Sequence, residues 1–190
     1  LALAAGQFIA WVARLGWIAR LDELAIEAAL AEIERTGDTL AVNISAESIC
    51  DTEFVARLIK HMERNPDSAS RLWLDLPEHG ALHHLAEFRK FCLAVKPLRC
   101  LLGLKHAGPG FARISEVHDL GLNHLKLDAS LSQGIQSDTG NQGFVRGVCT
   151  LVHSIGMLAI AEGVSSQEER DTLVSVGVDG LTGPAVRPPP

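Results

Sequence analysis

The sequence predicts an α/β fold in which six short strands alternate with helices. Each predicted strand is a run of four or five residues rich in apolar side chains, and the segments between strands carry apolar residues at helical spacing. Strands that alternate with helices pair in parallel through right-handed crossovers. The region before the first strand supplies only helices, so we predict a (β/α) TIM-like barrel that is incomplete at its N-terminus. An open, doubly wound sheet would satisfy the same alternation.

Two helices are predicted before the first strand. The first is indicated by Phe8, Trp11, Val12 and Leu15, which recur at helical spacing and are followed by a glycine. The second is indicated by residues 21–35, which are rich in Ala, Leu and Glu and therefore favour a helix.

The remaining elements alternate along one domain of 190 residues. Asp51 is placed to cap a helix, Pro77 ends the second strand, and Ser166 with Glu169 has the spacing of a capping box. The predicted strands are 40–44, 72–76, 100–104, 125–128, 157–161 and 178–181, and the predicted helices between them are 51–62, 85–95, 114–120, 144–155 and 166–176.

The composition argues against two classes of protein, disordered chains and general nucleic-acid binders. Hydrophobic residues make up 47% and charged residues 21% of the chain, so it can bury a core and is not disordered. The net charge of −6 argues against general binding of nucleic acid polymers, which requires a basic surface. None of the four cysteines belongs to a CxxC pair, so we predict free thiols in a reducing compartment and a cytoplasmic location.

No segment of the sequence is long and apolar enough to cross a membrane. The longest stretch without a formal charge, Gly147–Ala161, is shorter than the roughly 20 residues that a bilayer-spanning helix needs. Residues 1–13 are apolar but lack the basic start of a signal peptide. The chain does not start with Met, so we expect a fragment, which a larger membrane protein could carry as its cytoplasmic part.

Polar side chains gather where the predicted strands end. In a parallel β/α barrel the active site forms at the C-terminal ends of the strands, so we expect a common site there. The alternative is ordinary polarity of the turns that must follow each strand. The residues concerned are Asn43, Asp75, Lys105, His106, Lys126, Asp128, Glu162 and Thr182.

Six short motifs at these strand ends form an ordered series. They are Asn43-Ile44-Ser45, Asp75-Leu76-Pro77-Glu78, the segment 105–110 (KHAGPG), Lys126-Leu127-Asp128, Ala161-Glu162-Gly163-Val164 and Thr182-Gly183. Together with Gly6-Gln7-Phe8-Ile9 near the start, the series resembles that of the EAL-domain family, the cyclic-di-GMP phosphodiesterases and their inactive receptor relatives. The resemblance covers nearly all of residues 1–190 and implies one degenerate EAL domain whose opening strand is absent.

The departures from the family pattern bear on catalysis. The resemblance implies hydrolysis of a phosphodiester with two divalent cations, Mg or Mn, held by carboxylate oxygens. Lys105 and His106 stand where the family has two aspartates, and Thr182 stands where it has Gln. The Glu-Ala-Leu segment that names the family is absent from this chain. The resemblance therefore implies a catalytically impaired member, in which Lys126 and Glu162 are remnants of the catalytic set.

Ligand binding is expected to be retained where catalysis is lost. Phosphates are bound by cationic side chains and backbone N–H donors and need these more than they need metal ions. Lys105 could pair with a phosphate in place of a lost cation, and the glycines of 107–110 would allow close backbone approach or simply make a tight turn. The resemblance implies that cyclic-di-GMP is bound by Asn43, Asp75, Lys105, Lys126, Asp128 and Glu162, with Asn43, Asp75 and Asp128 as remnant metal ligands.

Two segments point to a branch of the family. Residues 103–106 (GLKH) and 179–184 (DGLTGP) are similar to the LapD-like membrane receptor branch. That similarity implies a sensor domain with a protein partner, or a homodimer that pairs at an exposed seam of the barrel.

Two functions compete with that of a receptor. The first is an active or weakly active metal-dependent cyclic-di-GMP phosphodiesterase, which the low number of carboxylates disfavours. The second is a zinc site at Glu78, His79, His83 and His84, which is disfavoured because the following helix uses other residues as its apolar face. A hydrolase elbow or a Walker loop is not found in the sequence.

Overall fold

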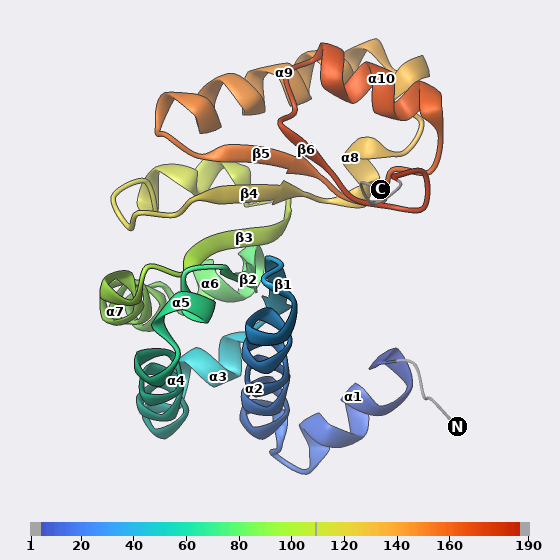
Figure 1. Ribbon diagram of the computed structural model, residues 1–190. Helices are drawn as coiled ribbons and strands as arrows, with labels where there is room; N and C mark the ends of the chain where they lie inside the picture. The colour runs from blue at the N-terminus through green and yellow to red at the C-terminus, as the bar shows by residue number, and fades with distance from the viewer. Residues whose placement is uncertain (1–4, 109, 187–190) are drawn as a thin grey trace. The chain divides into compact units, whose positions relative to one another are not determined.

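The computed structural model describes residues 5–108 and 110–186, with side chains from residue 9 onward (Figure 1). These residues form two compact units. Unit 1 consists of residues 5–76 and 80–101, and unit 2 consists of residues 77–79, 102–108 and 110–186.

Unit 1 is mainly helical around one pair of parallel strands. Residues Leu40, Ala41, Val42 and Asn43 of β1 pair in register with Leu72, Trp73, Leu74 and Asp75 of β2. The elements in chain order are α1 (Ala5–Arg14), α2 (Ile18–Thr36), β1 (Leu40–Asn43), α3 (Ala46–Cys50), α4 (Thr52–Arg64), α5 (Pro66–Ala69), β2 (Leu72–Pro77), α6 (Glu78–His83), α7 (Leu85–Val95) and the 3₁₀ turn η1 (Lys96–Leu98), of which β2 and α6 extend across the boundary to unit 2.

The core of unit 1 is built from apolar stripes on its helices. Buried residues of α2 recur every three or four positions, as do those of α4 and α7, which matches the helical period. Helix α4 begins where Asp51 accepts hydrogen bonds from the backbone N–H groups of Glu53 (2.8 Å) and Phe54 (3.2 Å). Helix α2 ends at Gly37, whose φ of 75° is left-handed.

Unit 2 carries the parallel strands β3, β4, β5 and β6 in that order. Helix α9 packs on β5, and the capping box of Ser166 and Glu169 opens α10, as predicted. The elements in chain order are β3 (Leu101–Ala107), the 3₁₀ helix η2 (Phe111–Glu116), β4 (His124–Leu127), α8 (Ala129–Ser132), η3 (Ile135–Ser137), α9 (Thr139–Ser154), β5 (Leu158–Ala161), α10 (Gln167–Ser175) and β6 (Gly180–Leu181), of which β3 begins with one residue of unit 1.

Several predicted boundaries were wrong. The segment predicted as a helix over 114–120 is a 3₁₀ helix at 111–116, because its backbone N–H groups bond to carbonyls three residues back, as Arg113 does to Gly110 and Val117 to Ile114. Helix α9 starts at residue 139, five residues early, because Asp138 caps it despite its glycines. Strand β3 runs three residues past its predicted end, and β6 is only two residues long.

The structure bears on two expectations: that the cysteines are free thiols and that no segment crosses a membrane. All four cysteines are free, Cys50 is exposed, and the others are buried. Burial raises the pKa of Cys92 to about 12 and that of Cys100 and Cys149 to about 11, so these thiols are inert at neutral pH. Within residues 5–108 and 110–186, no helix is long and apolar enough to span a bilayer.

Candidate functional site

The end of β3 carries a bulge that positions two of the predicted site residues. Gly103 and Leu104 pair with consecutive residues of β4, but Ala107 pairs with Leu127, so β3 holds one more residue than its partner over this stretch. The extra residue falls within Lys105–His106, and His106 has a φ of +53°, which non-glycine residues rarely adopt. Bulges of this kind redirect side chains, and here the bulge presents a mostly exposed imidazole.

The imidazole of His106 lies between two carboxylates of unit 2. Its Nδ1 is 3.2 Å from Oε2 of Glu162 and 3.7 Å from Oδ2 of Asp128. The backbone N–H of His106 also donates a long hydrogen bond (3.4 Å) to Oε2 of Glu162. The structure therefore brings three residues from the ends of three neighbouring strands to one place.

The carboxylates are held by the ends of β4 and β5. Asp128 follows β4 and caps α8, where its Oδ1 accepts hydrogen bonds from Oγ (2.6 Å) and N (3.0 Å) of Ser130. The hydroxyl and then the backbone N–H of Ser130 lower the pKa of Asp128, so this carboxylate stays ionised. Glu162 directly follows β5, and its backbone N–H donates to the carbonyl of Leu127 (3.3 Å).

The two lysines of the predicted set differ in exposure. Lys126 lies in the middle of β4 and is buried, whereas Lys105 is half-buried beside His106. A buried lysine is costly unless a partner compensates it, and Lys126 does have an interaction partner. Unit 2 thus carries an imidazole and two carboxylates at the ends of β3, β4 and β5, together with one lysine in β3 and one within β4.

Glu78 fixes the loop after β3, a role that the sequence interpretation missed. Its side chain is 2% exposed, and its Oε2 accepts hydrogen bonds from the backbone N–H groups of Gly110 (2.9 Å) and Gly108 (3.2 Å). Its Oε1 is buried without a hydrogen-bond partner. Its place in the strand-end motif Asp75-Leu76-Pro77-Glu78, directly after a strand-ending proline, was the signal that could have indicated this role.

We expect Glu78→Gln to loosen that loop locally. The neutral amide makes weaker hydrogen bonds than the carboxylate, and it buries two N–H donors beside the existing donors of Gly108 and Gly110. Amide hydrogen exchange at Gly110 should accelerate by about 10-fold or more. The amide of Asp128, which bonds to Ala107, is the internal control and should be unaffected. Unchanged exchange at Gly110 would show that Glu78 is not what holds the loop.

The other predicted site residues lie elsewhere. Asn43 and Asp75 belong to unit 1, where they are paired neighbours at the ends of β1 and β2, with Asp75 buried and Asn43 exposed. Thr182 of unit 2 is exposed directly after β6, and its backbone N–H bonds to the carbonyl of Ala161 (2.8 Å). The motif at 6–9 lies in α1, where the side chains of 6–8 are outside the described residues.

The histidines near Glu78 do not form the competing zinc site. His79 and His83 are exposed, and the rings of His83 and His84 pack edge to face at 4.8 Å. Among the described residues, the group of acidic and histidine side chains with metal-ligand spacing is instead Glu23, Glu27 and His61.

Comparison with known protein families identifies the family of this chain. The profile of the EAL domain family matches residues 1–189. The chain belongs to the EAL domain family. The order of motifs at the strand ends therefore indicated the correct family.

The relatives of this EAL domain include named phosphodiesterases. It is 25% identical over 143 residues to the cyclic di-GMP phosphodiesterase PdeF of Escherichia coli K12, a match that covers 75% of this chain and 19% of PdeF. It is 21% identical over 183 residues to the signaling protein YkoW of Bacillus subtilis, covering 94% of this chain and 23% of YkoW. The chain thus spans about a fifth of the length of these relatives.

Solved structures of EAL domains share its fold. The FimX EAL domain of Xanthomonas citri, in complex with c-diGMP, has a TM-score of 0.89 at 24% identity, covering 96% of this chain and 74% of that one. The apo S helix–GGDEF–EAL structure of Vibrio cholerae LapD has a TM-score of 0.88 at 22% identity, covering 96% and 45%. These matches confirm the predicted EAL-type α/β barrel fold and exclude a doubly wound sheet.

Proposed function

We propose that this EAL domain is catalytically impaired and acts in cyclic-di-GMP signalling as a receptor or interaction module. The observation that carries the proposal is the position of His106, whose imidazole nitrogen lies within 3.7 Å of both Asp128 and Glu162. Lys105 and His106 stand where the family has the two aspartates of a metal-binding loop. An imidazole and a lysine therefore take the place of two hard oxygen donors.

The side chains of unit 2 do not fit two hard cations. Mg²⁺ and Mn²⁺ favour oxygen ligands, and a two-metal site needs several carboxylates to offset its positive charge. The ends of β4 and β5 offer Asp128 and Glu162, and one oxygen of Asp128 is committed to Ser130. Both carboxylates face His106, and a lysine beside it adds repulsion toward a cation. Catalytic roles for Lys126 and Glu162 remain predictions.

Binding of a phosphodiester ligand is the function that these residues support. Lys105 and Lys126 supply charge for phosphate groups, and the backbone near Gly108 and Gly110 allows close approach. The FimX structure from X. citri holds c-diGMP, which makes this ligand the one to test. A ligand-binding role for Asn43 and Asp75 of unit 1 stays a prediction. Binding of a protein partner or formation of a homodimer, membership of the LapD-like branch, a cytoplasmic location and one domain over residues 1–190 also stay predictions.

The competing function is a metal-dependent cyclic-di-GMP phosphodiesterase. The name of PdeF favours it, because that relative is a cyclic di-GMP phosphodiesterase. The test is incubation of the protein with cyclic-di-GMP and Mg²⁺ or Mn²⁺, followed by chromatographic separation of the linear product. We expect no product above the metal-free control. Turnover on the order of 1 per second or faster would establish an enzyme and refute the proposal.

Ligand binding should depend on the charge of Lys105. If Lys105 pairs with a phosphate, we expect Lys105→Ala to weaken cyclic-di-GMP binding by about 10-fold, and Lys105→Glu to weaken it further through repulsion. Both losses should shrink at higher salt because the pairing is partly screened. Isothermal titration of the three proteins at two salt concentrations measures this. Equal affinities would show that Lys105 only extends along the strand-end surface.

A further inference from the structure

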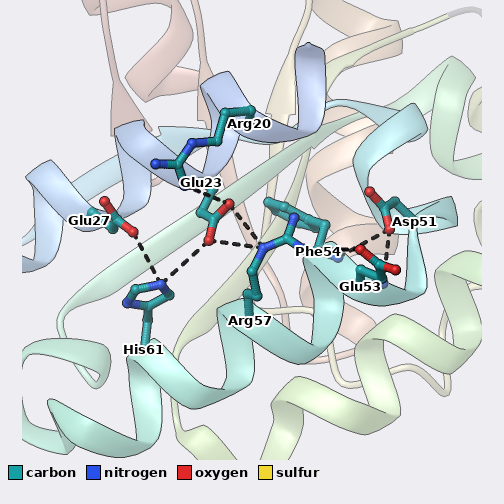
Figure 2. Close-up of polar contacts among 8 residues, drawn as sticks. All are labelled: Arg20, Glu23, Glu27, Asp51, Glu53, Phe54, Arg57 and His61. Carbon is teal, nitrogen blue, oxygen red and sulfur yellow. Dashed lines mark hydrogen bonds and ion pairs between the residues drawn. The ribbon is translucent and has the colours of Figure 1, made fainter. Parts of the chain in front are cut away.

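A second group of chemically active side chains lies in unit 1, on helices α2 and α4 (Figure 2). Glu23 and Glu27 are four residues apart on α2 and therefore share one face of that helix. His61 reaches toward them from α4: its Nε2 is 3.1 Å from Oε1 of Glu27 and 3.5 Å from Oε1 of Glu23. One ligand atom from each of the three residues lies within 4.8 Å of the others.

Glu23 is held ionised and in a fixed orientation. It is 4% exposed, its two oxygens accept hydrogen bonds from Nε of Arg57 (3.0 and 3.1 Å), and Arg20 pairs with Oε2 at 3.0 Å. Burial acts to raise the pKa of Glu23, but the hydrogen bonds from Arg20 and Arg57 outweigh it, so the pKa is lowered. Hydrogen-bond partners that orient a carboxylate are usual around metal ligands. The two guanidinium groups also repel a cation, so the negative charge of the group has to exceed theirs.

The surroundings of the three residues also suit a bound cation. The apolar side chains of Ile26, Phe54 and Leu58 line the hollow beside Glu23 and His61, which limits water on that side. On the other side, His61 and Glu27 are only half-buried, so an ion and a water ligand have access. The three carboxylates of Glu23, Glu27 and nearby Glu53 outnumber the two guanidinium groups of Arg20 and Arg57.

We propose that Glu23, Glu27 and His61 bind one divalent transition-metal ion of the Zn²⁺ type and so link α2 to α4. A nitrogen ligand with two carboxylates suits zinc, whereas Mg²⁺ and Ca²⁺ prefer oxygen ligands alone. Three protein ligands with an open fourth position match the partial exposure of the group. This site is separate from the strand-end residues of unit 2 and does not depend on the proposed function.

The test is titration of the metal-free protein with ZnCl₂, monitored by calorimetry and by thermal unfolding. We expect zinc to bind and to raise the Tm, because an ion that binds only the folded state stabilises it. His61→Gln and Glu27→Gln should each weaken the binding by more than 10-fold. Co²⁺ in place of Zn²⁺ should give visible absorption bands in the wild type, and His61→Gln should lose those bands.

Two matched variants distinguish zinc binding at Glu23, Glu27 and His61 from zinc binding at a neighbouring carboxylate or at the strand-end imidazole. Glu32→Gln changes a partly exposed carboxylate of α2 that pairs with Arg35 and is not a ligand, and His106→Gln removes the imidazole of the strand-end group. Both should bind zinc like the wild type. Circular dichroism of the metal-free variants checks their folding, which should persist because His61 and Glu27 are half-buried.

Three outcomes would refute the proposal. The first is that the wild type binds no zinc at 100 μM, a concentration on the order of the Kd of a weak site. The second is that His61→Gln and Glu27→Gln bind zinc as tightly as the wild type does. The third is that His106→Gln alone loses binding, which would place the ion at the strand ends of unit 2.

Discussion

Replacing Gly103 with alanine is expected to destabilise this EAL domain by about 3 kcal/mol. Gly103 lies in β3 directly beside His124 of β4, and a Cβ built on Gly103 overlaps the imidazole ring of His124. His124 is completely buried, so the ring cannot move aside without disturbing its neighbours. Chemical denaturation of the wild type and variant, fitted for the free energy of unfolding, measures the effect.

The matched control for this change is Gly147→Ala. Gly147 lies within α9, and a Cβ added there meets nothing within 4 Å. Alanine at that position should leave stability unchanged or raise it by up to about 1 kcal/mol, because glycine is the weaker helix former. If both variants were equally stable, β3 and β4 would not approach as closely as the structure shows.

The second large effect is expected at Glu169, the buried carboxylate at the start of α10. Its Oε1 accepts a hydrogen bond from the backbone N–H of Gly134 (2.9 Å), and its Oε2 accepts from N (2.7 Å) and Oγ (2.8 Å) of Ser165. One carboxylate thus connects α10 to the turn before η3. Because hydrogen bonds to a charged acceptor are strong, we expect Glu169→Gln to cost about 2 kcal/mol at pH 7.

The effect of Glu169 should depend on pH in a defined direction. The backbone N–H groups of Gly134 and then Ser165 lower the pKa of Glu169 below its usual value. A lowered pKa in the folded state means that the carboxylate contributes stability above its unfolded pKa and loses it as pH falls through the folded pKa. Unfolding curves of the wild type and Glu169→Gln should therefore converge in acid, below about pH 4.

Glu168→Gln provides the control for this experiment. Glu168 occupies the same first turn of α10 but is exposed, so the variant loses the same favourable interaction with the helix dipole without losing the buried hydrogen bonds. It should cost no more than about 0.5 kcal/mol. A loss at Glu168 equal to that at Glu169 would assign the effect to the helix dipole instead.

The sequence predicted the alternation of elements because local patterns encode it. Strands such as 158–161 are short apolar runs, and the capping box of Ser166 and Glu169 marks a helix start that the structure confirms. Boundaries were less predictable: helix α9 contains glycines in its first turns, and only the cap at Asp138 explains its early start. The 3₁₀ helix at 111–116 has no periodic signal long enough to define it.

The sequence by itself determined the family and the residue types at the strand ends. The strand-end motifs are short contiguous segments, so they can be recognised without knowing which residues are in contact. Tertiary structure decided how those residues are used. The bulge in β3 turns His106 toward Asp128 and Glu162, and the loop after β3 closes on Glu78, which lies thirty residues or more away. The group of Glu23, Glu27 and His61 likewise exists only because α2 and α4 pack together. Such contacts join residues far apart in the chain, and no local pattern records which distant partner a side chain meets.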